Sequence, residues 1–507
     1  MVRELTAASI AGVGYLTKRG RPGIPKLFGV SGQLLYGCES WSDHICDIDS
    51  PTIAVAELLR EFLPHHHSTS IEVVASTSTF VGTLPAWRWV KGHGKEFLGL
   101  YDEPSQADIL FDLAGRLRYE GRLEEALVAS KDSVHLRRVL AQPPAKSKVK
   151  HATPLDNILH RLSNIGKGNA AMIRARQAMH RRQNATGEQP ETLNTTEKLA
   201  DSLSNLSVHL SDLGRHKDAL AANQEAVGLR RALAAERPEA FNAVLADSLN
   251  NLSIRLSDLG RHAEALAAIQ EAVGIYRALA AERPQAFNAA LAVSLNNLSV
   301  DLSSHGRHEE ALAAIQEAVG LRRAFAAERP AAFNAALADS LNNLSIRLSD
   351  HGRHAEALAA IQEAVGLRRA LAAERPAAFN DALAESLHNL SANFSNLGQH
   401  EEALAAIQEA VGLCRALAAE RPVAFNADLA DSLYNLSICL SRLVRHDEAL
   451  EAAQESVDMY RAVAAERPKV FTSRLSNALW QLSEYLSASG RAAEAEVALE
   501  EARSLRL

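Results

Sequence analysis

Leu245-Ala-Asp-Ser-Leu-Asn-Asn-Leu-Ser253 returns, with few changes, every 46 residues along the chain. A fixed period in the range of about 20 to 50 residues is typical of stacked supersecondary units, none of which buries a core alone. The repeat therefore predicts a long array rather than several globular domains. The central leucine of the unit recurs in seven copies, at Leu203, Leu249, Leu295, Leu341, Leu387, Leu433 and Leu479.

Composition narrows the class of protein. Hydrophobic residues make up 47% and aromatics only 5%, and the abundance of alanine and leucine favours helices. A net charge of −7 argues against nucleic acid as a partner. No apolar run reaches the ~20 residues that span a bilayer, so we expect no membrane contact. The N-terminus lacks a signal-peptide pattern and the four cysteines lack framework spacing, which predicts a cytoplasmic protein with free thiols.

Each repeat is predicted to be a helical hairpin. Asn242 is placed to cap a first helix, because Thr196 and Thr472 replace it in other copies and share with asparagine the ability to cap. A leucine stripe follows, and Gly260 ends the helix in a left-handed turn. A longer second helix is expected to end at Pro284. Val444 replaces the turn glycine in one copy and predicts a turn there that is strained or differently shaped.

The pattern of Leu249, Leu252, Leu256, Gly260, Ala265, Ile269 and Ala272 resembles the tetratricopeptide repeat. The late proline and Leu-Asn-Asn-Leu-Ser resemble the long-repeat subgroup typified by kinesin light chain. The resemblance covers residues 196–507 and implies an all-α, right-handed solenoid of helical hairpins. Residues 106–190 hold two degenerate copies, Leu110 to Leu140 and Leu155 to Arg182, with linkers.

Residues 1–100 are not repeats and are predicted to be mostly helical. Leu34 to Trp41 and the amphipathic run Ala54 to Phe62 resemble the segment after the winged helix in fungal NACHT-type (STAND) signalling ATPases. No Gly-x-x-x-x-Gly-Lys-Ser/Thr loop occurs, so the chain has no recognisable nucleotide site. The resemblance implies a regulatory arm whose ATPase domain is absent from this chain, and self-association through this region.

A carboxamide recurs beside the leucine stripe, and it is the first candidate for partner binding. In the tetratricopeptide family this side of the first helix lines the concave groove, and groove asparagines of kinesin light chain bind peptide backbone. The alternative is that each asparagine bonds the adjacent helix and fixes the repeat register. The position holds Asn205, Asn251, Asn297, Asn343, Asn389 and Asn435, with Gln481 in the last copy.

The preceding position varies, from Ser204 through three asparagines to His388, Tyr434 and Trp480. We interpret His388 and Tyr434 as anchors for a partner, and Trp480 as a cover for the end of the array. Carboxylates such as Asp247 and Asp339 predict a partner with some basic residues, or else a solvated charged face.

No pattern of catalytic residues, cofactor-binding residues or metal ligands was found, so we expect no enzyme activity, cofactor or metal. The histidines of the turns, one per repeat from His216 to His446, would lie ~10 Å apart, too far to share one ion. The sequence thus predicts a protein-interaction scaffold that binds a protein or peptide segment in a groove. The alternative is the sensor arm of a signalling ATPase.

Overall fold

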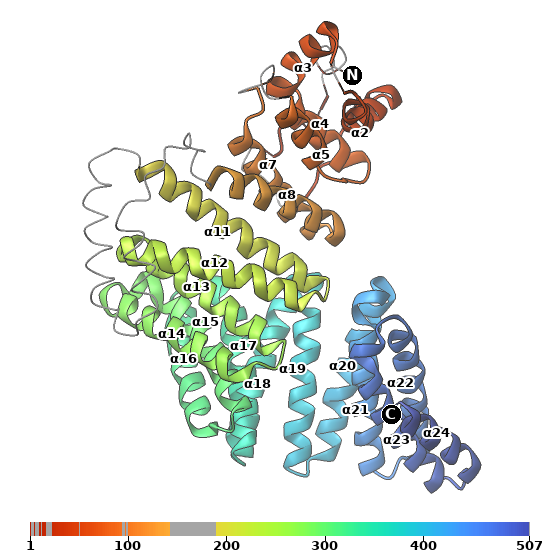
Figure 1. Cartoon of the computed structure of the whole chain (residues 1–507). Coiled ribbons are helices and arrows are strands. Elements are labelled where there is room, and N and C mark those ends of the chain that lie inside the picture. Colours follow the sequence, from red (N-terminus) through yellow and green to blue (C-terminus); the bar gives the residue numbers. More distant parts are fainter. Residues whose placement is uncertain are drawn as a thin grey trace, which may run out of the picture. The chain divides into compact units, whose positions relative to one another are not determined.

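The computed structural model is helical throughout the part of the chain that it describes, which confirms the all-α prediction (Figure 1). It describes residues 1, 5, 10–11, 13–16, 23–49, 51–93, 97, 100–141 and 189–505. Within these residues the β structure is limited to an isolated bridge between Ala11 and Phe28. No helix in the described ranges is long and apolar enough to cross a membrane.

The chain divides into two compact units, Met1–Ala272 (unit 1) and Val273–Leu507 (unit 2), with the boundary inside helix α14. In unit 1 the helices before the repeats are α2 (Gly32–Cys46), α3 (Ile53–His65), α4 (His67–Thr77), α5 (Leu84–Gly92), α7 (Glu103–Tyr119) and α8 (Leu123–Ala141). The repeats continue with α11 (Gln189–Asp212), α12 (His216–Glu236), α13 (Pro238–Ser257) and the start of α14 (His262–Glu282). The hairpin of α7 and α8 covers the first degenerate copy; the second, Leu155 to Arg182, lies outside the described residues.

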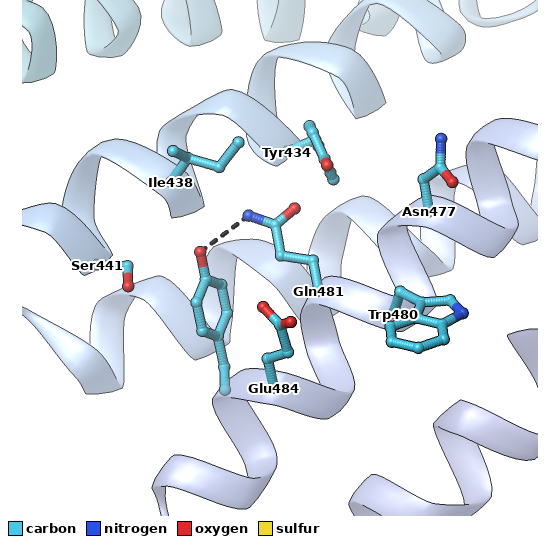
Figure 2. Close-up of a pocket in the computed structure, with 8 residues that line it drawn as sticks. Tyr434, Ile438, Ser441, Asn477, Trp480, Gln481 and Glu484 are labelled. Atoms are coloured by element: carbon cyan, nitrogen blue, oxygen red, sulfur yellow. Dashed lines mark hydrogen bonds between the residues drawn. The ribbon is translucent and has the colours of Figure 1, made fainter. Parts of the chain in front are cut away.

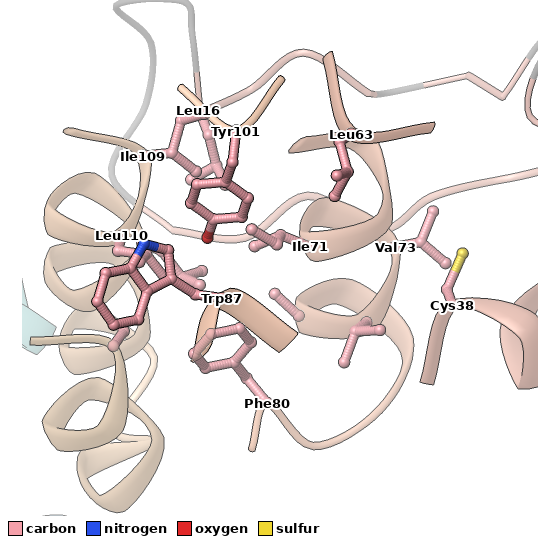
Figure 3. Close-up of a cluster of buried hydrophobic side chains, with 14 of the residues drawn as sticks. Leu16, Cys38, Leu63, Ile71, Val73, Phe80, Trp87, Tyr101, Ile109 and Leu110 are labelled. Atoms are coloured by element: carbon pink, nitrogen blue, oxygen red, sulfur yellow. The ribbon is translucent and has the colours of Figure 1, made fainter. Parts of the chain in front are cut away.

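One buried cluster joins the N-terminal helices to this first hairpin (Figure 3). Phe62 from α3, Ile71 from α4 and Trp87 from α5 pack in the same cluster as Leu110 from α7. Burial of such large apolar side chains is the main stabilising contribution to a small helical region. The cluster therefore extends across residue 100, where the sequence changes from non-repeat to repeat character.

Unit 2 consists of the rest of α14 and successive hairpins, each made of a first and a second helix. The first helices are α15 (Pro284–Ser304), α17 (Pro330–Asp350), α19 (Pro376–Asn396), α21 (Pro422–Arg442) and α23 (Pro468–Ala488). The second helices are α16 (His308–Glu328), α18 (His354–Glu374), α20 (His400–Glu420), α22 (His446–Glu466) and α24 (Ala492–Ser504). From α15 to α24 each helix packs against the next, and successive first helices α15 to α21 also touch one another.

The first helices begin five residues earlier than predicted. Each starts at the proline expected to end the preceding helix, so Asn288 and its equivalents lie inside the helix rather than at its N-cap. Proline suits the first helical position because its fixed φ is helical and its missing N–H would have no intrahelical partner there. Thr472 likewise donates its hydroxyl to the Pro468 carbonyl at 2.6 Å from within α23. Complete first and second helices are therefore similar in length, not short and long.

The turn within each hairpin is as predicted. Gly306 and Gly352 adopt φ +70°, and the N–H of Arg307 bonds back to the Leu302 carbonyl at 3.0 Å, as in a Schellman turn. Val444 adopts φ +62°, the one positive φ of a non-glycine residue in the described chain. A β-branched side chain is disfavoured in this region, which confirms the expected strain.

Candidate functional site

The leucine stripe is buried, which turns the opposite side of each first helix outward. Leu295, Leu341 and Leu387 are fully buried. We call the outward positions in unit 2 the first-helix face. It comprises Val293, Asn297 and Val300 on α15, Asp339, Asn343 and Ile346 on α17, Glu385, Asn389 and Ala392 on α19, Asp431, Asn435 and Ile438 on α21, and Asn477, Gln481 and Glu484 on α23.

The predicted asparagines are half-buried on this face, whereas Gln481 is buried, and they differ in their bonding. Asn343 Nδ2 donates to Asn296 Oδ1 at 3.0 Å, and Asn389 Nδ2 donates to Asn342 Oδ1 at 3.0 Å. Both bonds join one repeat to the preceding repeat, as the register alternative requires. Asn297 and Asn435 make no side-chain hydrogen bond to another described residue of the chain. In unit 1, Asn205 and Asn251 are also half-buried.

The variable position turns partly inward. Asn342 is 2% exposed, so it belongs to the helix packing and not to a free surface. His388 is half-buried, and its Nε2 lies 2.7 Å from Ser432 Oγ on α21. Burial lowers the pKa of His388, although Asp431 opposes the shift. His388 on α19 therefore bonds across to α21.

Tyr434 and Trp480 lie at one surface hollow, which we call the terminal hollow (Figure 2). Its volume is about 560 Å³, and first helices α21 and α23 alone supply its walls. Gln481 Nε2 donates to the Tyr485 hydroxyl at 2.8 Å and to Ser437 Oγ at 3.1 Å. The hollow thus combines aromatic surface with polar groups. Its residues are Tyr434, Ile438, Ser441, Asn477, Trp480, Gln481, Glu484 and Tyr485.

Trp480 lines the terminal hollow and is 38% exposed. The rise in bulk from Ser204 to Trp480 was the sequence signal for this site. Ile438 and Glu484 were not singled out, because their equivalents in other repeats carry no distinguishing pattern.

A second cavity of about 410 Å³ lies between α19, α20 and α21, and we call it the acidic pocket. Four carboxylates line it, together with His388, Cys414 and apolar side chains. Asp431 is already engaged by the Tyr460 hydroxyl and by Arg474 Nη1, the latter at 2.6 Å. Burial, reinforced by Asp431, raises the pKa of Asp428, while Arg474 opposes the shift. The four carboxylates are those of Asp381, Glu385, Asp428 and Asp431.

The predicted carboxylates Asp247 and Asp339 are both exposed. Asp339 Oδ1 accepts from Arg368 Nη2 at 2.8 Å, so its charge is partly neutralised within the chain. The histidines of the turns start the second helices α12, α14, α16, α18, α20 and α22, whereas α24 starts at Ala492. Among the residues that the structure describes, no three His, Cys, Asp or Glu side chains are placed to share a metal ion.

Comparison with known proteins identifies the repeats. The model of the family described as "Tetratricopeptide repeat" matches residues 199–236, 245–282, 291–324, 337–374 and 383–419. No curated protein matches the chain.

Solved structures of similar fold include BtubC (BKLC) from P. vanneervenii, at 20% identity and TM-score 0.40, covering 48% of this chain and 89% of that one. They also include nearly identical TPR-like repeats from a Podosopora anserina protein assigned to the kinesin light chains, at 18% identity and TM-score 0.34, covering 45% and 98%. Aspartyl phosphate phosphatase F from Bacillus subtilis matches at 13% identity and TM-score 0.43, covering 80% and 94%.

The five matched segments begin at one period of 46 residues and contain the helical hairpins described above. The matched segments of residues 199–419 are therefore tetratricopeptide repeats.

Proposed function

We propose that this chain is a non-enzymatic scaffold that binds an extended segment of a partner protein along the first-helix face of unit 2. Tetratricopeptide repeats are protein-interaction modules, which supports the general class. The terminal hollow carries the finer proposal, because it is a concave surface site formed by first helices alone. Binding hot spots are enriched in tryptophan and tyrosine, and both line this hollow.

The spacing of the repeats suits an extended segment. Neighbouring packed helices lie ~10 Å apart, and an extended chain rises ~3.3 Å per residue, so each repeat would address about every third residue. Asn297 and Asn435 are the carboxamides we assign to such contacts, since each can donate to and accept from a peptide group. Asn343 and Asn389 would have to break an inter-repeat bond to do the same.

A selection from a random peptide library displayed on phage, with the full chain as bait, tests the proposal. Affinities of the enriched peptides are then measured by calorimetry for the wild type and for Trp480→Ala combined with Tyr434→Ala. We expect the double variant to lose at least about tenfold in affinity. Val497→Ala is the matched control, since Val497 is an exposed apolar residue of α24 outside the hollow. Failure to enrich any peptide, or equal binding by the double variant, would contradict the proposal.

The second candidate function, the arm of a signalling ATPase, rests on the N-terminal region. Helix α3 exposes Ile53 (80%) and Leu58 (51%), although it buries Leu59 and Phe62. Exposed apolar side chains on one helix can mark a site of association. Analytical ultracentrifugation of the full chain and of Ile53→Ser with Leu58→Ser tests this function. We expect the wild type to self-associate and the variant to be monomeric; a monomeric wild type would contradict it.

A further inference from the structure

An arginine of the second helix is buried in four hairpins and held by a recurring set of acceptors. Arg368 on α18 is 4% exposed. Its Nη1 donates to the Ala382 carbonyl and, at 2.5 Å, to Ser386 Oγ, and its Nη2 donates to Asp339 Oδ1 at 2.8 Å. The planar fork of a guanidinium matches such an arrangement of acceptors. We call this set of acceptors the guanidinium socket.

The same socket recurs elsewhere in the array. Arg322 Nη1 donates to the Ala336 carbonyl and to Ser340 Oγ, both at 2.6 Å. In unit 1, Arg230 donates to Ser248 Oγ and, at 2.5 Å, to Asp201 Oδ1. Arg137 on α8 donates in the same way to Ser202 Oγ at 2.6 Å and to Asp108 Oδ1 at 2.8 Å, so the chain shows four times how this site between helices holds a guanidinium.

In the next repeat the socket is present without its arginine. Position 414, which is 46 residues after Arg368, holds a cysteine, and the equivalent acceptors are the Asp428 carbonyl, Ser432 Oγ and the Glu385 carboxylate. Ser432 Oγ donates to the Asp428 carbonyl at 2.7 Å and lies 3.3 Å from Cys414 Sγ and 2.7 Å from His388 Nε2. A cysteine side chain is far shorter than an arginine. The acidic pocket of about 410 Å³ lies at this position.

The charged residues around this socket also differ from those around the equivalent sockets. Asp381 stands where the neighbouring repeats have Ala335 and Ala427, and Asp428 stands where they have Ala336 and Ala382. Compared with the equivalent site at Arg368, the pocket thus lacks the arginine and has two additional carboxylates. Asp428 makes no hydrogen bond or salt bridge through its carboxylate to another residue in the described chain, and burial and Asp431 raise its pKa.

The following repeat also lacks the arginine, but it supplies a replacement. Tyr460 takes the arginine position and donates to Asp431, which Arg474 of α23 also contacts at 2.6 Å. Glu385, the carboxylate of the socket at Cys414, has weaker contacts than Asp431. Arg368 Nη1 lies 3.6 Å from Glu385 Oε2, and Asn342 Nδ2 lies 3.5 Å from Glu385 Oε1. Among the sockets that lie wholly in unit 2, the one at Cys414 is therefore the one with neither an arginine nor a tyrosine at its centre; Arg474, which lies near it, is bound to Asp431.

We propose that the acidic pocket recognises an arginine side chain of the partner protein. The inference rests on the proposed function, because the arginine would belong to the bound segment. The incoming guanidinium would donate to Ser432 Oγ, to the Asp428 carbonyl and to Glu385, as Arg368 does in its own socket. Asp381 and Asp428 would add charge at the pocket and favour a cation over a neutral side chain. The fork geometry favours arginine over lysine.

A short acetylated and amidated peptide tests the proposal, with arginine at its centre between glycine and serine. Its affinity for the full chain is measured by NMR saturation transfer, beside peptides that carry citrulline or lysine at the same place. Citrulline keeps the shape without the charge, and lysine keeps the charge without the fork. We expect the arginine peptide to bind at least about tenfold more tightly than the citrulline peptide, and more tightly than the lysine peptide. Equal binding of the arginine and citrulline peptides would overturn the proposal.

Cys414→Arg is the decisive variant, because it should fill the pocket with the chain's own guanidinium. We expect this variant to lose the preference for the arginine peptide and to melt no lower than the wild type. Cys414→Ser is the matched control and should bind as the wild type does. If Cys414→Arg does not fold, Glu385→Gln combined with Asp428→Asn replaces it, and that variant should lose the same preference. Undiminished arginine preference in the folded blocking variant would contradict the assignment.

The outcome is separable from that of the proposed function. Library peptides that depend on Trp480 but bind Cys414→Arg and the wild type equally would leave the scaffold function standing and remove the arginine pocket. Loss of all peptide binding to the first-helix face, with the arginine preference retained, would remove the extended groove and keep the pocket.

Discussion

Asn389 donates its side-chain Nδ2 to Asn342 Oδ1 at 3.0 Å, across the contact between two successive repeats. Asn342 is 2% exposed and also accepts from Ser386 Oγ at 3.3 Å. A buried amide oxygen is costly to leave without a donor, so the bond contributes to the stacking of the two repeats. The carboxamide of Asn389 thus serves the array itself.

Replacing Asn389 with alanine is expected to destabilise unit 2 by about 1 kcal/mol, because Asn342 Oδ1 keeps only its bond from Ser386. The shift of the urea midpoint, followed by circular dichroism, measures the effect. Asn435→Ala is the matched control at the equivalent position, where no bond to another described residue is lost. Asn435→Ala should lower the free energy of unfolding by less than about 0.5 kcal/mol while weakening partner binding. Equal destabilisation by both variants would show that all carboxamides fix the register.

Val444→Gly is expected to stabilise the protein. The Val444 N–H bonds to the Ser441 carbonyl at 3.0 Å and the Arg445 N–H to the Leu440 carbonyl at 3.0 Å, as in the glycine turns, so the turn holds valine at φ +62°. Glycine removes the steric cost, but it also has a larger conformational entropy in the unfolded chain, which opposes folding. We expect the net increase in the free energy of unfolding to be about 0.5–1 kcal/mol. A raised melting temperature is the readout. Gly398→Val, at φ +74°, should lower it, and a melting temperature unchanged by both substitutions would contradict the assignment of strain.

The sequence was sufficient to predict the hairpins and their turns. The leucine period follows from one side of a helix facing the core, and Leu341 is fully buried as expected. The helix start was misplaced because asparagine and threonine both cap helices, so their exchange at position 242 looked like a cap. In fact these residues lie within a helix that starts at proline, and Thr472 satisfies its hydroxyl on the Pro468 carbonyl.

The site was predicted only in part, for a physical reason. Tyr434 could be selected because large aromatic side chains stand out among asparagines in an internal alignment. The burial of Arg368 could not be predicted from the sequence, because arginines on an amphipathic helix are usually solvated. Its acceptors come together only when the hairpins pack. The internal alignment of the repeats shows Cys414 in place of the arginine, with Asp381 and Asp428 in place of alanines. The alignment alone does not show that these positions lie together, because the contacts of Arg368 with its acceptors are seen only in the structure.

Stability of unit 1 is expected to fall as the pH is lowered from 7 to 5. His209 on α11 is 2% exposed, and its Nδ1 lies 2.6 Å from Ser130 Oγ on α8. Burial, with a smaller contribution from Arg118, lowers the pKa of His209 to about 4, against the opposing charge of Asp212. Between this value and the ordinary pKa of about 6.5 the unfolded chain binds a proton that the folded chain does not. The stabilisation is therefore present above pH 6.5 and is lost as the pH falls.

The expected loss from His209 at pH 5 is roughly 2 kcal/mol, from about 1.4 kcal/mol for each unit of pKa shift. Guanidinium denaturation at pH 7 and pH 5 measures it. His209→Gln keeps a hydrogen-bonding side chain beside Ser130 but cannot titrate. Burial also lowers the pKa of His67 to about 4, so the variant should retain part of the pH dependence. A pH dependence in the variant as large as in the wild type would exclude His209 as a source.

The adjacent residues Arg368 and Arg369 are expected to differ strongly in their contribution to stability. Arg369 Nη2 lies 2.5 Å from Glu409 Oε2 in an exposed pair, and exposed pairs typically contribute less than about 1 kcal/mol. Arg368 is buried and donates to a carbonyl, to Ser386 Oγ and to Asp339. Removing it would leave buried acceptors without donors, at a cost of about 2–3 kcal/mol.

The two substitutions Arg368→Met and Arg369→Met test this difference with the same chemical change at neighbouring positions. Methionine keeps a long side chain and removes the guanidinium, so helix propensity changes little. We expect Arg369→Met to shift the denaturation midpoint slightly, and a high salt concentration to abolish that shift, because salt screens exposed pairs. Arg368→Met should shift the midpoint several times more, and salt should change its effect little. Similar, salt-sensitive losses for both variants would mean that Arg368 is no more than a surface ion pair, and the guanidinium socket would lose its energetic basis.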